Sequence, residues 1–171
     1  VALAAATVLL TSTPSAQTAR RAATNEIVPG VRRELLSVPF NAGTRGTYQL
    51  DAMVVRPTTP GRHPLAIISH GSPRSGEDRT AMTPTSQTAI AIEFARRGWT
   101  TLVLMRRGYG DSEGAWAESY GTCASPDYEA AGRASAQDLR AAIRFATDHG
   151  DQLAIGREHA IASVPVAPED R

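Results

Sequence analysis

The pattern of hydrophobic and polar positions predicts two adjacent strands early in the chain. Residues 33–40 are rich in aliphatic side chains and end at a turn-forming Asn-Ala-Gly at residues 41–43. Residues 47–56 alternate between apolar and polar types, as expected for a half-buried strand. The side chains that share its apolar face are Tyr48, Leu50, Ala52 and Val54. The two segments together predict a β-hairpin.

Two later segments are continuously apolar and predict buried strands. They cover residues 65–69 and 100–105 and lack polar alternation, as expected for strands that are covered on both faces. Between them, a polar loop over residues 71–86 precedes a helix predicted over residues 87–97, which Gly98 ends.

A second helix is predicted over residues 127–149. Ser-Pro-Asp at residues 125–127 is typical of a helix start, because Pro fits the first turn and an acid there faces the positive end of the helix dipole. Gly150 ends the helix. The side chains expected to face the core are Ala131, Leu139, Ala142, Ile143 and Ala146. Buried strands separated by helices predict an α/β fold, with an N-terminal hairpin and a parallel sheet covered on both faces.

The length of 171 residues suits one domain with flanking segments. Residues 1–17, an apolar Ala-rich run followed by small polar residues, resemble a secretory signal peptide and predict a secreted or periplasmic protein. The run is too short for a stable membrane span. We expect a linker over residues 18–31, the folded domain over 32–150 and an irregular or aberrant tail over 151–171.

Composition and charge exclude several classes of partner. The net charge is +1 and all 18 basic residues are arginines that look scattered along the chain, which gives no reason to expect a nucleic acid or an anionic membrane. Cys123 is the only cysteine, and His63, His70, His149 and His159 lack the spacing of metal ligands. We therefore expect neither a metal nor a cofactor.

The end of the strand at residues 65–69 is the first candidate for chemistry. It runs into His70, Gly71 and Ser72, and a Gly at this place lets the backbone turn with N–H groups facing open space. Such N–H groups at the carboxyl end of a strand can stabilise an oxyanion. We expect the backbone N–H of Ser72 to be the donor, with Gly71 and His70 supporting the loop. The alternative is an ordinary turn between a strand and a helix, which could have the same four residues, His-Gly-Ser-Pro at 70–73.

The second motif is Arg-Gly-Tyr-Gly-Asp-Ser-Glu-Gly at residues 107–114, directly after the strand at 100–105. Together with His-Gly-Ser-Pro at residues 70–73, it resembles the α/β-hydrolase superfamily, in particular dienelactone hydrolases and CocE/X-Pro-peptidase-like enzymes. The resemblance covers roughly residues 32–149. It implies a partial α/β-hydrolase sheet and acyl transfer to water by Ser, His and Asp with an oxyanion hole. In such enzymes the His of the His-Gly pair organises the oxyanion loop and is not the general base.

Ser112 lies within a Gly-x-Ser-x-Gly pattern and is a candidate nucleophile. Three observations oppose this role. A nucleophile elbow passes directly from strand to helix, and no helix is predicted after Glu113. Asp111 and Glu113 would repel the anion that forms during attack. In the family pattern, this loop precedes the long helix and the elbow follows it.

The elbow is therefore expected beyond Gly150, where Ser163 is the nearest serine. Ile161 and Pro165 occupy the positions that need small residues, so Ser163 fits the role poorly. The prediction is a chain that carries the oxyanion side of a serine hydrolase, truncated or frame-disrupted before its nucleophile and catalytically incompetent alone. The intact enzyme would cleave a small-molecule ester, lactone or peptide.

Two other hypotheses stay open from the sequence. Gly108, Gly110 and Gly114 after a buried strand could form a dinucleotide-binding loop, although such a loop needs a helix that starts at its glycines. The chain could also be a non-catalytic remnant or binding module built on the same half-sheet.

Overall fold

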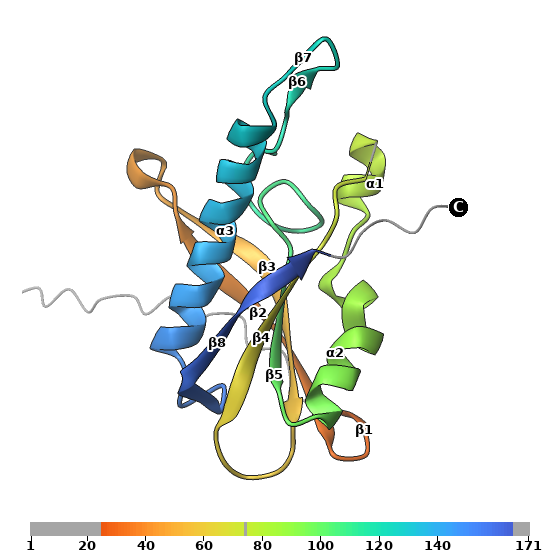
Figure 1. Ribbon diagram of the computed structural model, residues 1–171, viewed down its shortest axis with the longest axis vertical. Coiled ribbons are helices and arrows are strands. Elements are labelled where there is room, and N and C mark those ends of the chain that lie inside the picture. The colour runs from red at the N-terminus through yellow and green to blue at the C-terminus, as the bar shows by residue number, and fades with distance from the viewer. Residues whose placement is uncertain (1–24, 74, 166–171) are drawn as a thin grey trace, which may run out of the picture.

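The computed structural model describes residues 25–73 and 75–165, and of residues 157–165 it describes the backbone alone. Its main sheet has six strands in the order β1-β2-β3-β5-β4-β8 (Figure 1). The strands are β1 (Asn25–Val28), β2 (Val31–Asn41), β3 (Thr47–Pro57), β5 (Thr100–Leu104), β4 (His63–Ser69) and β8 (Ile155–Pro165). A separate two-stranded ribbon, β6 (Gly121–Thr122) and β7 (Ser125–Pro126), projects from one end.

The first half of the sheet is the predicted hairpin. Strands β2 and β3 pair antiparallel without interruption, from Val31 opposite Pro57 to Asn41 opposite Thr47. The connecting turn contains the short 3-10 helix η1 (Gly43–Arg45), and Gly43 has a φ of 67°, a left-handed conformation that favours glycine. The Asn41 carboxamide oxygen accepts a hydrogen bond from the Gly43 N–H at 2.8 Å.

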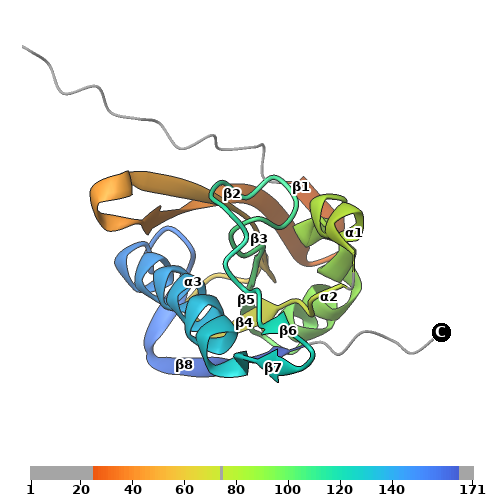
Figure 2. The ribbon, with the colours of Figure 1, turned by 90° about the horizontal axis from the view of Figure 1, so that it is seen from above.

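The second half of the sheet is parallel. Strand β5 pairs antiparallel with β3 and parallel with β4, and β4 pairs parallel with β8. Parallel neighbours need a crossover, and helices supply it on both faces. Helix α2 (Thr88–Arg96) connects β4 to β5, and α3 (Tyr128–Asp148) lies between β5 and β8. Figure 2 shows α2 and α3 on opposite sides of the sheet.

The core is divided by the sheet into two layers of apolar side chains. Under α3, Ala142 and Ala146 pack against apolar side chains from one face of the hairpin and against Leu65, Leu102 and Ile155. Under α2, Ala91 and Ala95 pack with Met53, Ile68 and Met105. The α/β fold class predicted from periodicity is confirmed.

Three predicted boundaries differ from the structure. The polar loop over residues 71–86 contains the short helix α1 (Gly76–Thr80) and the start of the 3-10 helix η2 (Pro84–Gln87). The Ser75 hydroxyl caps the first turn of α1, because it accepts a hydrogen bond from the Asp78 N–H at 2.9 Å. The expected linker over 18–31 contains β1. The tail over 151–171, expected to be irregular, contains β8, a long strand of the sheet. Its Gly-Arg-Glu at residues 156–158 breaks the apolar pattern, so pairing with β4 rather than local hydrophobicity defines it.

The predicted core face of α3 is also partly wrong. Ile143 is 40% exposed, whereas Ala141 is buried. Each residue turns the helix by about 100°, so the buried face centred on Ala142 and Ala146 leaves Ile143 turned outward. The leader predicted over residues 1–17 lies outside the described residues. No helix among those described is both long and apolar enough to cross a membrane.

Candidate active site

The candidate site lies where β4 and β5 end. Because the two strands are parallel, their carboxyl ends meet at one edge, with Ile68 opposite Val103. The segment at residues 70–72 continues from β4, and the loop that begins at Arg106 continues from β5. Strand β8 ends at the same edge, with Pro165 opposite Ser69.

His70 joins the two loops from a buried position, with 3% of its surface exposed. Its Nε2 accepts a hydrogen bond from the backbone N–H of Arg106 at 3.1 Å, and its Nδ1 lies 2.7 Å from the carbonyl oxygen of Gly71. A backbone N–H can only donate and a carbonyl can only accept, so the ring carries its proton on Nδ1. This neutral tautomer fixes the turn after β4 against the end of β5.

Burial, and after it the nearby Arg106 guanidinium, lower the pKa of His70, and the net pKa is about 4. The Gly71 carbonyl and Glu118 act in the opposite direction but do not compensate. The ring is therefore neutral at pH 7, with its acceptor nitrogen occupied by the backbone. This arrangement suits a positioning residue and leaves no lone pair for a general base.

Arg106 ties the ends of β4 and β5 to the following loop. Its guanidinium donates to the Ser69 hydroxyl at 2.5 Å, to the His70 carbonyl at 2.8 Å and to Glu118 through both of its oxygens, one of them at 2.9 Å. Burial by itself lowers the pKa of Arg106, but hydrogen bonding and attraction to Glu118 outweigh it and the net pKa is raised. A bidentate pair in a buried place holds both side chains in one geometry.

The phenol of Tyr109 extends this network to Ser72. The Tyr109 Oη lies 2.8 Å from Glu118 Oε2 and 2.9 Å from Ser72 Oγ, and the Trp116 indole N–H donates to it at 3.2 Å. Tyr109 is fully buried, and its ring packs against His70 at 4.4 Å between centroids. The network therefore positions the turn at residues 70–72 from two sides.

The backbone N–H groups of Gly71 and Ser72 have no acceptor among the side chains of residues 25–73 and 75–156 or the backbone of residues 25–73 and 75–165. Ser72 is an exposed residue at the edge of the sheet, and its N–H donates to none of the described acceptors. An open N–H on an otherwise fixed turn is the geometry that an oxyanion donor requires.

The glycines of the second motif shape a closed loop. A Cβ built on Gly108, Gly110 or Gly114 would lie 2.5 Å from the Trp116 backbone, 2.2 Å from the Met82 carbonyl oxygen or 2.8 Å from the Tyr48 ring. All three have positive φ angles, and α3 begins only at Tyr128. The space beside each glycine is filled by protein and no helix starts there, so the dinucleotide-binding hypothesis is not favoured.

Ser112 is buried inside this loop with both hydrogen-bonding functions occupied. Its hydroxyl donates to the Met105 carbonyl at 2.7 Å and accepts from the Asp51 N–H at 2.9 Å. The neighbouring Glu113 forms two more hydrogen bonds with the backbone of Gln49, at 2.8 and 2.9 Å. These contacts attach the loop to β3 and give Ser112 a structural role.

Sequence reasoning missed the residues that hold the site together. Arg106, Glu118 and Asp138 were not singled out, because charged side chains are normally expected at the surface. The Asp138 carboxylate, 2% exposed, accepts from the Arg107 backbone N–H at 2.9 Å and from its side-chain Nε at 2.7 Å, joining α3 to the loop. Asp138 stands four residues before Ala142, so both lie on the same face of the helix. An acid on the predicted core face was the signal that could have revealed the buried role of Asp138.

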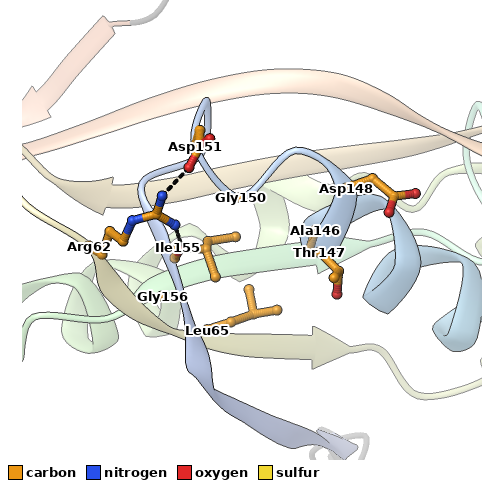
Figure 3. Close-up of a pocket in the computed structure, with 9 residues that line it drawn as sticks. All are labelled: Arg62, Leu65, Ala146, Thr147, Asp148, Gly150, Asp151, Ile155 and Gly156. Atoms are coloured by element: carbon orange, nitrogen blue, oxygen red, sulfur yellow. Dashed lines mark hydrogen bonds and ion pairs between the residues drawn. The ribbon is translucent and has the colours of Figure 1, made fainter.

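A hollow with a volume of about 510 Å³ lies elsewhere in the described chain (Figure 3). Its lining includes Leu65, Gly150 and Arg62, and Arg62 donates to the Ile155 carbonyl at 3.0 Å and pairs with Asp151. Since Leu65 stands near the start of β4, this hollow is at the opposite end of the sheet from His70 and Ser72. Among the described residues, no group of His, Cys, Asp and Glu side chains could hold a metal ion.

No protein-family model and no curated protein matches the chain. Several solved structures do match the chain. An acetyl xylan esterase from Paenibacillus sp. R4 superposes with a TM-score of 0.55 at 16% identity, over 86% of this chain and 45% of that one. The chain shares the α/β-hydrolase fold.

Two further solved structures match with TM-scores below 0.5. A CE15 glucuronoyl esterase from Teredinibacter turnerae T7901 matches with a TM-score of 0.49 at 10% identity, over 86% of this chain and 38% of that one. A cold-adapted esterase from an Arctic intertidal metagenomic library matches with a TM-score of 0.46 at 18% identity, over 75% and 51%. The chain therefore spans about half of these proteins or less.

Proposed function

We propose that this chain forms the oxyanion side of an ester- or amide-cleaving serine hydrolase, with the backbone N–H of Ser72 as an oxyanion donor. The observation that carries the proposal is the open N–H of Ser72 on a turn fixed by His70 and Tyr109, at the edge where β4, β5 and β8 end. The α/β-hydrolase fold supports it.

In the proposed reaction, a serine hydroxyl presented after β8 attacks the acyl carbon and passes its proton to a histidine. The carbonyl electrons move to oxygen, and the Ser72 N–H donates to that oxyanion. The leaving alcohol or amine takes the proton from the histidine, and water releases the acyl group by the same steps. Pairing of Ser69 with Pro165 brings the end of β8 beside the oxyanion turn.

The finer assignment rests on the resemblance to dienelactone hydrolases and CocE/X-Pro-peptidase-like enzymes. On that basis, we propose small-molecule esters, lactones or peptides as substrates and a secreted or periplasmic location. We further propose that this chain alone supplies no working nucleophile. Ser112 is occupied by Met105 and Asp51.

Labelling with a fluorophosphonate, followed by intact-mass measurement, tests the role of Ser112. We expect no stoichiometric adduct on the chain. We expect Ser112→Ala to cost about 1–3 kcal/mol of unfolding free energy in urea, because a buried N–H and a buried carbonyl lose their partner. Stoichiometric labelling that Ser112→Ala abolishes would show that Ser112 is the nucleophile.

The coding sequence beyond the Arg171 codon tests the wider proposal. We expect a Gly-x-Ser-x-Gly turn followed by a helix in one of its frames, and p-nitrophenyl acetate hydrolysis by the chain extended through that segment. Ser72→Pro, which removes the N–H, should then lower kcat by about 10²–10³-fold, whereas Ser72→Ala, which keeps it, should lower kcat less than about tenfold. Absence of such a turn, or equal effects of the two variants, would contradict the proposal.

A further inference from the structure

A second hollow, with a volume of about 360 Å³, lies between the tip of the β2–β3 hairpin and helix α3. Figures 1 and 2 both show the hairpin tip beside this helix. We call it the arginine pocket. The residues that characterise its lining are Phe40, Tyr48, Arg45, Arg107, Arg140 and Arg144.

Three of its four guanidinium groups are without an acidic partner. Arg107 is neutralised by Asp138, but Arg45, Arg140 and Arg144 form no ion pair with any residue in the described ranges. The pocket therefore concentrates about three positive charges in a chain whose net charge is +1. Four of the 18 arginines, which look scattered along the sequence, line one pocket because the fold brings the hairpin tip to one face of α3.

Other helical arginines of this chain do have partners. Arg96 and Arg97 pair with Glu93 on α2, and Arg133 pairs with Glu129 on α3. In contrast, Arg140 and Arg144 stand four residues apart on one helix face, where like charges repel by about 0.2–0.5 kcal/mol. Attraction to the negative end of the helix dipole is confined to the last turn, so it does not account for Arg140. A bound anion would remove this repulsion.

The amide side chains of the pocket are oriented as donors. The Asn41 oxygen accepts from the Gly43 N–H at 2.8 Å, and the Gln137 oxygen accepts from Arg107 at 3.3 Å. With both oxygens engaged internally, the NH₂ groups remain to donate. Together with the guanidinium groups, they give the pocket hydrogen-bond donors and little to attract a cation.

The remaining wall is aromatic. The Phe40 and Tyr48 rings stack with 6.5 Å between centroids, and the Arg107 guanidinium lies 4.1 Å from the Phe40 centroid. A volume of about 360 Å³ is at the lower end of small-molecule sites, and Arg matches the geometry of phosphate and carboxylate oxygens. We propose that the arginine pocket binds a small organic molecule through its phosphate or carboxylate group. This proposal does not depend on the acyl-transfer function.

Calorimetric titration of the chain at low ionic strength tests the proposal. The probes are glucose 6-phosphate, inorganic phosphate and glucuronate, with glucose as the neutral control. We expect saturable binding of at least one anion and none of glucose. Tighter binding of glucose 6-phosphate than of glucuronate would identify phosphate as the preferred group, and the reverse order would identify carboxylate.

The variant Arg140→Gln/Arg144→Gln keeps good helix formers while it removes two charges from the pocket. Arg96→Gln/Arg97→Gln removes the same charge from α2 and serves as the matched control. We expect at least a tenfold rise in Kd for the pocket variant and less than a twofold rise for the control. Equal weakening by both variants, or no saturable binding of any of the three anions, would overturn the proposal. A circular dichroism melt of each variant shows that the fold is retained.

Discussion

His70 is neutral in the folded protein although its usual pKa lies near physiological pH. The backbone N–H of Arg106 occupies Nε2, and protonation there would break this hydrogen bond and place a cation beside the Arg106 guanidinium. The unfolded chain has no such penalty. The residue that positions the proposed oxyanion turn therefore makes the fold sensitive to acid.

We expect the unfolding free energy to fall by roughly 2 kcal/mol between pH 7 and pH 5 because of His70. Its pKa is about 4 in the folded state and about 6.5 in the unfolded state, so the unfolded chain takes up more protons in this window. The stability is complete above about pH 6.5 and is lost as the pH falls toward 4. Urea unfolding at several pH values measures the change.

The control for this prediction is His70→Gln, which keeps an acceptor for the Arg106 N–H but cannot titrate. Its pH dependence over the same range should be smaller by about the same 2 kcal/mol. If wild type and variant lost the same stability between pH 7 and pH 5, another group would be responsible and the neutral state of His70 would be in doubt.

At the scale of elements, the loop after β5 is held by contacts with distant segments. Gly110 donates from its N–H to the Arg79 carbonyl, and the neighbouring Ser112 and Glu113 bond to β3. The glycines were recognisable from the sequence as loop-shaping residues. Their close neighbours Met82 and Tyr48 were not, because they come from distant parts of the chain.

We expect Gly110→Ala to destabilise the fold by more than about 3 kcal/mol, since the new Cβ would lie 2.2 Å from the Met82 carbonyl oxygen and φ is 54°. Gly43→Ala is the matched control, with a φ of 67° and open space around the Cβ. It should cost only the conformational strain, about 1 kcal/mol. Similar losses in thermal or urea unfolding would show that the Met82 contact is unimportant.

At the scale of the whole molecule, β8 completes the described sheet and brings its carboxyl end to the proposed site. Leu153 and Ile155 belong to the core layer under α3, although the sequence predicted an irregular tail there. The first residue of β8 also holds the turn after α3, since the Ile155 N–H donates to the Gly150 carbonyl at 2.7 Å.

We expect Ile155→Ala to lower the unfolding free energy by about 2–4 kcal/mol, as for a large side chain removed from a core. Ile155 is 5% exposed, whereas Ile143 is 40% exposed, so Ile143→Ala should cost less than about 1 kcal/mol. Urea unfolding of both variants makes the comparison. If the two losses were equal, residues 151–165 would not be integrated in the core.

The sequence by itself determined the hairpin, the strands β4 and β5 and the helices α2 and α3. Each of these elements has a local period of apolar residues and a turn or cap at its ends, and these are short-range properties. The turn at His70–Ser72 was also visible, because glycine after a buried strand is a local signal. The leader-like start stays a prediction, since it lies outside the described residues. The poor fit of Ser163 to a nucleophile also stays a prediction, since only its backbone, within β8, is described.

Only the tertiary structure decided β8, the network around His70 and Arg106, and the arginine pocket. Strand β8 depends on pairing with β4, about 90 residues earlier in the chain. Burial disfavours the charges of Arg106 and Asp138, and ion pairs with Glu118 and Arg107 offset that cost. The pocket exists because the hairpin tip meets α3. Each of these features depends on contacts between residues far apart in the chain, and a local pattern of residues does not show which distant residues will meet.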